Sequence, residues 1–93
     1  MKGFKGFVKD PNAILDYSLD WGPWLDGDTI STSVWVVESP LAIEAGTENF
    51  NDTVTTLYIS GGDVNQRYTV TNTITTAAGR RDDRSLELRI RNR

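Results

Sequence analysis

The chain has 93 residues, of which 38% are hydrophobic and 25% charged, and its formal net charge is −3. A chain of this size encloses one hydrophobic core, so we expect a single globular domain. It contains no cysteine and no histidine, which excludes disulfides and thiolate metal sites and removes the commonest metal ligand and general base. No apolar run approaches the ~20 residues that cross a bilayer, and the N-terminus lacks the apolar centre of a secretion signal, so no membrane contact is expected.

Charge is unevenly distributed along the chain. Residues 1–63 contain three Lys and ten Asp or Glu, a net charge of −7, whereas residues 64–93 contain seven Arg and three Asp or Glu, a net charge of +4. A basic end can attract nucleic acid, but the acidic protein as a whole is repelled by phosphate at long range. Because arginine is enriched at protein interfaces, the pattern favours protein partners and disfavours nucleic acid.

The first nine residues, MKGFKGFVK, carry no turn signal and alternate only weakly through Phe4 and Phe7. We interpret residues 1–9 as an N-terminal arm that a partner would order. The Asp-Pro pair that follows favours a turn, or one helical turn capped by Asp10. The folded domain is expected to span residues 10–93.

Residues 13–21 show the period-two alternation of a strand with one buried face. Apolar and polar residues alternate through this stretch, while helical periodicity is nearly absent from the whole chain. The inward-facing residues are expected to be Leu15, Tyr17, Leu19 and Trp21. Similar patterns recur along the chain, so the fold is predicted to be all-β.

A second strand is predicted at residues 30–37, ISTSVWVV. Strict alternation would place Ile30, Val34 and Val36 on one face, and Trp35 and Val37 on the other. Apolar residues on both faces are typical of a central strand.

Two further segments follow the Ser-Pro break. Residues 41–44 form a short segment, and after a polar loop residues 53–60, TVTTLYIS, resume the strand pattern. The spacing of Val54 and Leu57 interrupts the alternation, which predicts a β-bulge near Thr55 and Thr56.

The strongest turn signal is SGGD at residues 60–63, since Gly61 and Gly62 accept positive φ without steric cost. Tyr68 opens the next strand. This arrangement is typical of the tyrosine corner of immunoglobulin-like domains, in which the phenol hydroxyl bonds back to the corner backbone. An ordinary tyrosine on a strand face fits the same spacing equally well.

Residues 67–76 and 85–91 both alternate, and AAGRRDD turns the chain between them, so they are predicted to form an antiparallel hairpin. About six to seven antiparallel strands separated by turns favour a small immunoglobulin-like β-sandwich over a barrel or a meander. The fold-defining residues are expected to be Trp21, Trp35, Tyr68, Gly61 and Gly62.

Four aspartates form the first candidate site: Asp16, Asp20, Asp26 and Asp28. On a strand, Asp16 and Asp20 would be roughly 13 Å apart at ~3.3 Å per residue, too far to share one ion. The segment DGD matches only a fragment of the calcium loop D-x-[DN]-x-[DN]-G, so it is expected to be a turn that holds no metal or cofactor. Weak Ca²⁺ binding at Asp26 and Asp28 stays an open alternative.

Catalysis is not expected. A glycosidase pair needs two carboxyl groups about 5–9.5 Å apart in a cleft, and a sandwich of this size has little depth for one. Without His or Cys, a nucleophilic Ser or Thr would need Lys2, Lys5 or Lys9 as its base, and all three lie in the predicted arm. The chain is therefore predicted to be non-enzymatic.

Trp24 and the arginines are candidates for binding. Trp24 would either stack on a sugar ring or close one end of the sandwich, and the second role is favoured because a large aromatic side chain buries the most area there. Outward-facing arginines on the last strand would either protect an edge strand or dock an acidic partner. The candidate protein-interface residues are Phe4, Phe7, Trp24, Arg80, Arg81, Arg84, Arg89 and Arg91.

Three segments resemble a family of short structural proteins of tailed bacteriophages and prophages, often described as fibre-tail adaptors. The segments are KDPNAILDYSLDW, WLDGDTISTSVW and YTVTNTITTAAGRRDDRSLELRI. The resemblance covers Lys9 to Asn92, while Met1 to Val8 and the stretch VESPLAIEAGTENFND lie outside its motifs. It implies an immunoglobulin-like sandwich that is a building block of the virion, assembled in the host cytoplasm, with no catalytic residues to transfer.

The function expected from this resemblance is a non-catalytic adaptor that docks between tail or head-tail proteins and fibre or adhesion components. The opposite charges of the two chain halves suit repeated docking between neighbours, so we expect a multimer in the particle. Two alternatives stay open: a carbohydrate-binding β-sandwich module and a capsid decoration protein.

Overall fold

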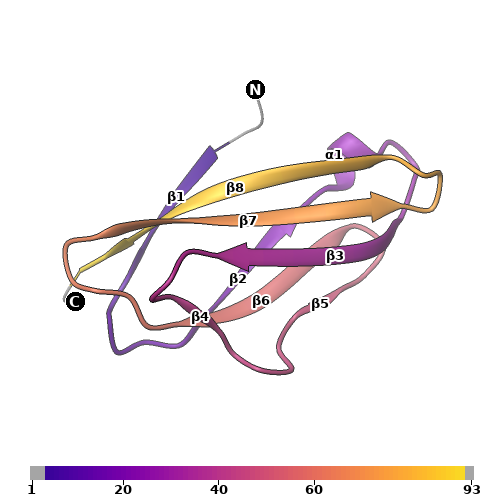
Figure 1. Ribbon diagram of the computed structural model, residues 1–93. Coiled ribbons are helices and arrows are strands. Elements are labelled where there is room, and N and C mark those ends of the chain that lie inside the picture. The colour runs from indigo at the N-terminus through magenta and orange to yellow at the C-terminus, as the bar shows by residue number, and fades with distance from the viewer. Residues whose placement is uncertain (1–3, 92–93) are drawn as a thin grey trace.

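The computed structural model describes the backbone of residues 4–91 and the side chains of residues 7–91. Two four-stranded sheets pack face to face as a β-sandwich (Figure 1), which confirms the predicted all-β class. The elements are β1 (Phe4–Lys9), β2 (Leu15–Asp20), α1 (Gly22–Leu25), β3 (Ile30–Val37), β4 (Ala42–Ile43), β5 (Asn49–Phe50), β6 (Val54–Ser60), β7 (Arg67–Thr76) and β8 (Arg81–Ile90).

The first sheet has the strand order β1-β8-β7-β3. Strands β7 and β8 form the predicted antiparallel hairpin, in register from Arg67 opposite Arg89 to Thr75 opposite Arg81. Strand β8 begins at Arg81, four residues before the predicted start. It lies between β1 and β7, so the interpretation of its arginines as protectors of an edge strand is wrong: β1 covers that edge.

Strand β1 comes from the segment interpreted as an N-terminal arm, and residues 1–3 of that segment lie outside the described residues. It pairs in parallel with β8, from Phe4 opposite Ser85 to Lys9 opposite Ile90. Two parallel neighbours cannot be joined by a tight turn. Here all the other strands, β2 to β7, lie between β1 and β8 in the sequence. Only antiparallel strands were predicted from the sequence, so this pairing departs from the expectation.

Lys9 closes β1 with a fully buried side chain. Its Nζ donates hydrogen bonds to the backbone oxygens of Asp10 at 2.9 Å and Gly61 at 2.7 Å. Burial lowers the pKa of the ammonium group, and the nearby charge of Asp10 partly opposes that shift. Lys9 thus ties the end of β1 to the corner that follows β6.

The second sheet is built around β6, which pairs with β2 along one side and with β4 and β5 along the other. The inward face of β2 carries Tyr17 and Leu19, and Trp21 is fully buried at its end, as the alternation predicts. Leu15, also expected inside, is 39% exposed at the start of the strand.

β3 is the last strand of its sheet, so the prediction of a central strand with apolar contacts on both faces is wrong. Trp35 is buried in the core, whereas Val34 and Val36 are 55% and 63% exposed. The register with β7 shifts between Ile30 and Thr32. This irregularity lets Ile30 point inward at one end while Trp35 points inward further along, which strict alternation forbids.

The bulge predicted at Thr55 and Thr56 is absent from the pairing of β2 with β6, which runs without interruption from Leu15 opposite Ile59 to Asp20 opposite Val54. The strand alternates regularly because Thr55, not Val54, fills the inward position and is completely buried. A polar residue occupies this core position because it has a buried hydrogen-bond partner.

That partner is Asn72 of β7, which is completely buried between the two sheets. Its Oδ1 accepts hydrogen bonds from Thr55 Oγ1 at 2.8 Å and Trp21 Nε1 at 3.0 Å. Its Nδ2 donates to Ser33 Oγ at 2.9 Å and to the backbone oxygen of Val34 at 3.1 Å. One amide therefore joins β6 and the end of β2 in one sheet to β3 and β7 in the other.

The corner between β6 and β7 contains Gly61 and Gly62, both at positive φ as predicted. A Cβ at Gly62 would lie 2.7 Å from side-chain carbons of Ile90, so the corner also requires a residue without a side chain. The Tyr68 hydroxyl accepts a hydrogen bond from the backbone N–H of Asp63 at 3.0 Å. This is the contact that the tyrosine-corner alternative predicts.

Candidate protein-docking surfaces

Two tryptophans and two arginines stack on one another at one end of the sandwich. Figure 1 shows α1 and the turn between β7 and β8 at this same end. The rings of Trp21 and Trp24 meet edge to face at 5.6 Å. The guanidinium of Arg80 lies 4.3 Å from the Trp24 ring centre, and that of Arg84 lies 4.2 Å from the Trp21 ring centre. Such cation–π contacts favour a fixed position for both arginines.

Hydrogen bonds within the chain hold these arginines further. Arg80 donates to the backbone oxygen of Leu25 at 2.6 Å and forms an ion pair with Asp28 at 3.2 Å. Arg84 donates to the backbone oxygen of Asp20 at 3.2 Å. Trp24 is half-buried and packs against the core, which fits the role of closing the sandwich. Arg80 lies just before β8, whereas Arg84 lies on that strand.

The four candidate aspartates are dispersed. Asp16 is exposed on β2, and Asp20 accepts a hydrogen bond from the N–H of Gly22 at 2.9 Å. Asp26 is exposed in the left-handed conformation that ends α1. Within residues 4–91, no three or more Asp, Glu, His or Cys side chains gather as they would around a metal ion.

Asp28 is held by several donors. Its Oδ1 accepts from the N–H of Thr29 at 2.8 Å and of Ala78 at 3.2 Å, and its Oδ2 pairs with Arg80. A hydrogen bond from the Thr76 hydroxyl has the largest effect on the pKa of the Asp28 carboxyl. Together with the bonds from Thr29, Ala78 and Arg80, it lowers this pKa to about 2. The carboxylate links the loop before β3 to the β7–β8 turn, so its role in the structure is to join two loops.

The remaining interface candidates lie elsewhere. Phe4 is on β1, and its side chain lies outside the described part of the chain. Phe7 is half-buried, and its ring meets the Tyr17 ring edge to face with 5.4 Å between the ring centres. Packing within the chain therefore explains an apolar residue here without a partner protein. Arg81 is exposed at the start of β8, while Arg89 lies near the opposite end of that strand and Arg91 follows its last residue.

One side of β3 forms an open edge of the first sheet, because within residues 4–91 this strand pairs with β7 alone. The eight-residue strand contains no charged residue. Near its start, the N–H of Ile30 is bonded to the backbone oxygen of Asp52, so the free edge begins at about Thr32. Beside it, Phe50 is 41% exposed and borders a hollow of about 260 Å³ that Ser33 also lines.

The outer face next to this edge is also uncharged. Val34 and Val36 lie directly opposite Thr73 and Thr71 of β7. Thr71 in turn exchanges a hydrogen bond with Ser85 of β8 at 2.9 Å. We call the exposed strand and its threonine neighbours the β3 surface: Val34, Val36, Thr71 and Thr73.

Reasoning from the sequence missed both Asn72 and the β3 surface. The signal for Asn72 was its place in the alternation of β7, where Val70 and Ile74 are the neighbouring inward residues. The signal for the β3 surface was the absence of charge from ISTSVWVV, which the sequence interpretation assigned to a covered central strand instead.

The structure combines a small two-layer sandwich with dispersed acids, an uncharged open edge and exposed arginines, an architecture that is common among binding and assembly domains. Within the described residues, no helix is long and apolar enough to cross a membrane. A family model described as podophage GP4 fiber-tail adaptor protein gp77 matches residues 9–89, and the chain belongs to this family. This membership confirms the resemblance to phage fibre-tail adaptors and makes the protein a virion component. Comparison with curated proteins gives no match.

Proposed function

We propose that the protein is a non-catalytic adaptor that docks between tail or head-tail proteins and fibre components through protein–protein contacts, as a multimer in the particle. The family match over residues 9–89, nearly the whole described domain, carries this proposal. The sandwich itself supplies the rigid support that an adaptor needs, since Asn72 and the buried core fix both sheets to each other.

The β3 surface is the first candidate for one of the docking contacts. A strand paired on one side presents half of its backbone N–H and C=O groups to the open side, and another strand can add there. Natural edge strands are usually protected by charges or proline, yet β3 has neither. Val34 and Val36 would supply the apolar contact area of such an interface.

The carbohydrate-binding alternative is less well supported by the site. Sugar stacking needs an open aromatic face, but Arg80 lies over the Trp24 ring and Trp21 packs against it. A capsid decoration protein would use the same kinds of contact as an adaptor and differs only in the surface of the particle that it covers.

Mass spectrometry of purified virions tests the adaptor proposal. We expect the protein to be present at a fixed multiple of the portal copy number, because a multimeric adaptor occupies equivalent positions around the tail axis. Its absence from intact particles would overturn the proposal, and its presence in numbers that match the capsid subunits would favour the decoration protein.

The role of the β3 surface is tested by Val36→Lys in the phage genome. A lysine at the centre of an apolar interface is left unpaired, so incorporation of the variant into particles should fall at least about tenfold, which corresponds to about 1.4 kcal/mol. Ile14→Lys is the control, because Ile14 is 55% exposed just before β2. Normal incorporation of both variants would exclude the β3 surface from assembly.

A further inference from the structure

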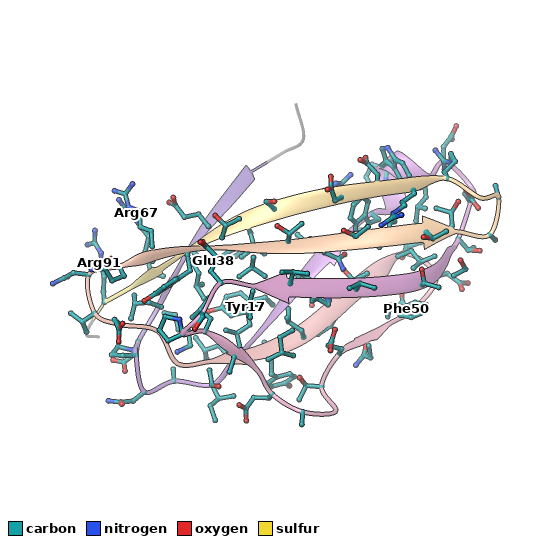
Figure 2. The ribbon with its side chains drawn as sticks, viewed as in Figure 1. Tyr17, Glu38, Phe50, Arg67 and Arg91 are labelled. Carbon is teal, nitrogen blue, oxygen red and sulfur yellow. The ribbon has the colours of Figure 1, made fainter. Side chains whose placement is uncertain are left out.

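A groove lies at the end of the sandwich opposite α1, where β7 begins and β8 ends. It has a volume of about 410 Å³. The groove is lined by Val64, Asn65, Gln66, Arg67, Arg89 and Arg91. Figure 2 shows Arg67 and Arg91 extending away from the sandwich at this same end.

The placement of its arginines is unusual for a sheet. Arg67 and Arg89 are directly opposite each other in the β7–β8 register, and Arg91 follows two residues later. Like charges at opposite positions in an antiparallel pair destabilise the sheet. Glu87, the acid nearest in sequence on β8, lies opposite Thr69 instead. Among residues 7–91, none of the three arginines forms an ion pair or a side-chain hydrogen bond.

Backbone bonds hold the floor of the groove in place. The N–H of Asn65 donates to the oxygen of Ile90 at 2.7 Å, and the N–H of Ile90 donates to the oxygen of Gln66 at 3.0 Å. The N–H of Arg91 donates to the oxygen of Lys9 at 2.9 Å. The three guanidinium groups therefore project from a fixed backbone, which lowers the entropy lost when a ligand binds.

The three guanidinium groups around this groove have no partner among residues 7–91. They are suited to carboxylates, which accept two parallel hydrogen bonds from each arginine. Because arginine is enriched at protein interfaces, a protein partner is favoured over a polyphosphate. We propose that this groove binds an acidic peptide segment, rich in Asp or Glu, of a neighbouring tail or fibre protein. The proposal rests on the adaptor function, because it names the chemistry of one partner of the adaptor.

Calorimetric titration of the full-length protein with a terminally blocked hexaglutamate peptide tests the proposal. We expect binding that weakens as salt is raised, and no binding of hexaglutamine at the same concentration. Arg89→Gln and Arg67→Gln should each weaken binding of hexaglutamate at least about fivefold. Arg81→Gln is the matched control, since it removes the same charge at the other end of β8 and should leave the affinity unchanged.

A thermal melt of the same variants separates binding from folding. Because Arg67 and Arg89 repel each other, Arg67→Gln should melt no lower than the wild-type protein while it loses affinity. An arginine that served only the fold would show the opposite result. Equal affinity of Arg89→Gln and Arg81→Gln for hexaglutamate would overturn the proposal, as would absence of binding by the wild-type protein.

Titration with a twelve-nucleotide oligo-dT compares nucleic acid with the acidic peptide as a ligand of the groove. If it binds more tightly than hexaglutamate and Arg89→Gln abolishes that binding, the groove is a nucleic-acid site and the proposed acidic peptide is wrong. If these titrations show no binding but mass spectrometry finds the protein in virions, the adaptor function is retained and only the acidic-peptide proposal is wrong. The two proposals can therefore fail separately.

Discussion

Asn72 occupies a position on β7 that the alternation of Val70 and Ile74 assigns to the core. An amide there is stable only because its hydrogen-bonding capacity is satisfied. Its Oδ1 accepts two hydrogen bonds and its Nδ2 donates two. Its partners come from both sheets, so the amide fixes how the sheets face each other as well as satisfying buried polar groups.

Replacement of Asn72 by leucine should lower the free energy of unfolding by at least about 2 kcal/mol. The change keeps the number and branching of the side-chain heavy atoms but leaves Trp21 Nε1 and the Thr55 hydroxyl buried without their acceptor. Urea unfolding measures the effect. Thr73→Val, at the next position on the outer face, should change stability by less than about 0.5 kcal/mol. Similar stability of the two variants would contradict the role given to the amide.

Asp28 predicts a dependence of stability on acid pH. Its pKa is about 2 in the folded chain and 3.8 in an unperturbed aspartate. A depressed pKa means that the ionised carboxylate stabilises the fold above about pH 4, and this contribution is lost as the pH falls from about 4 to about 2. The wild-type melting temperature should therefore fall more steeply across this window than that of Asp28→Asn. Asp16→Asn, at an exposed position on β2, should retain the wild-type slope; parallel curves for all three proteins would exclude the effect.

At the scale of elements, the alternation of apolar residues identified most strands, but it left the inward face of β3 open and predicted a bulge in β6 that is absent from the pairing with β2. On β3 the register shift near Ser31 changes which residues point inward, and no local pattern in ISTSVWVV marks that shift. On β6 the inward position is filled by Thr55, whose burial depends on Asn72, 17 residues away in sequence. Hydrophobicity alone cannot identify a buried polar residue, because its stability depends on a partner from another strand.

The β6–β7 corner was predicted more fully, because its signal is local. Two adjacent glycines mark the turn, and Tyr68 follows within the same short segment. Whether its hydroxyl bonds back to the corner depended on the path of the chain around Asp63, which the sequence left open.

Tyr68→Phe tests the strength of this corner. The variant removes one hydrogen bond from the N–H of Asp63 without changing the packing of the ring, so the free energy of unfolding should fall by about 1 kcal/mol. Tyr58→Phe is the control, since Tyr58 is 41% exposed on β6. Chemical unfolding of both variants gives the comparison, and equal midpoints would show that the hydroxyl of Tyr68 adds nothing to the corner.

For the whole molecule, the two-sheet architecture followed from the number of strands and turns, but the position of β1 did not. Its partner β8 lies about eighty residues away in the chain, with Phe4 opposite Ser85. Long-range parallel pairing leaves no turn or spacing signal in the sequence. The family match begins at Lys9, so most of β1 also lies outside the part of the chain that the family model describes.

A chain that begins at Asp10 tests whether β1 belongs to the folding unit or is a separable arm. The deletion removes the strand that covers the edge of β8, the contact of Phe7 with Tyr17, and the bonds of Lys9 to the corner at Gly61. We expect a loss of about 3 kcal/mol in the free energy of unfolding, from lost apolar burial and buried hydrogen bonds. A chain that begins at Phe4 is the control and should unfold at the urea concentration of the full chain. If the chain from Asp10 is equally stable, β1 contributes nothing to the fold and the original interpretation of an arm that a partner orders gains support.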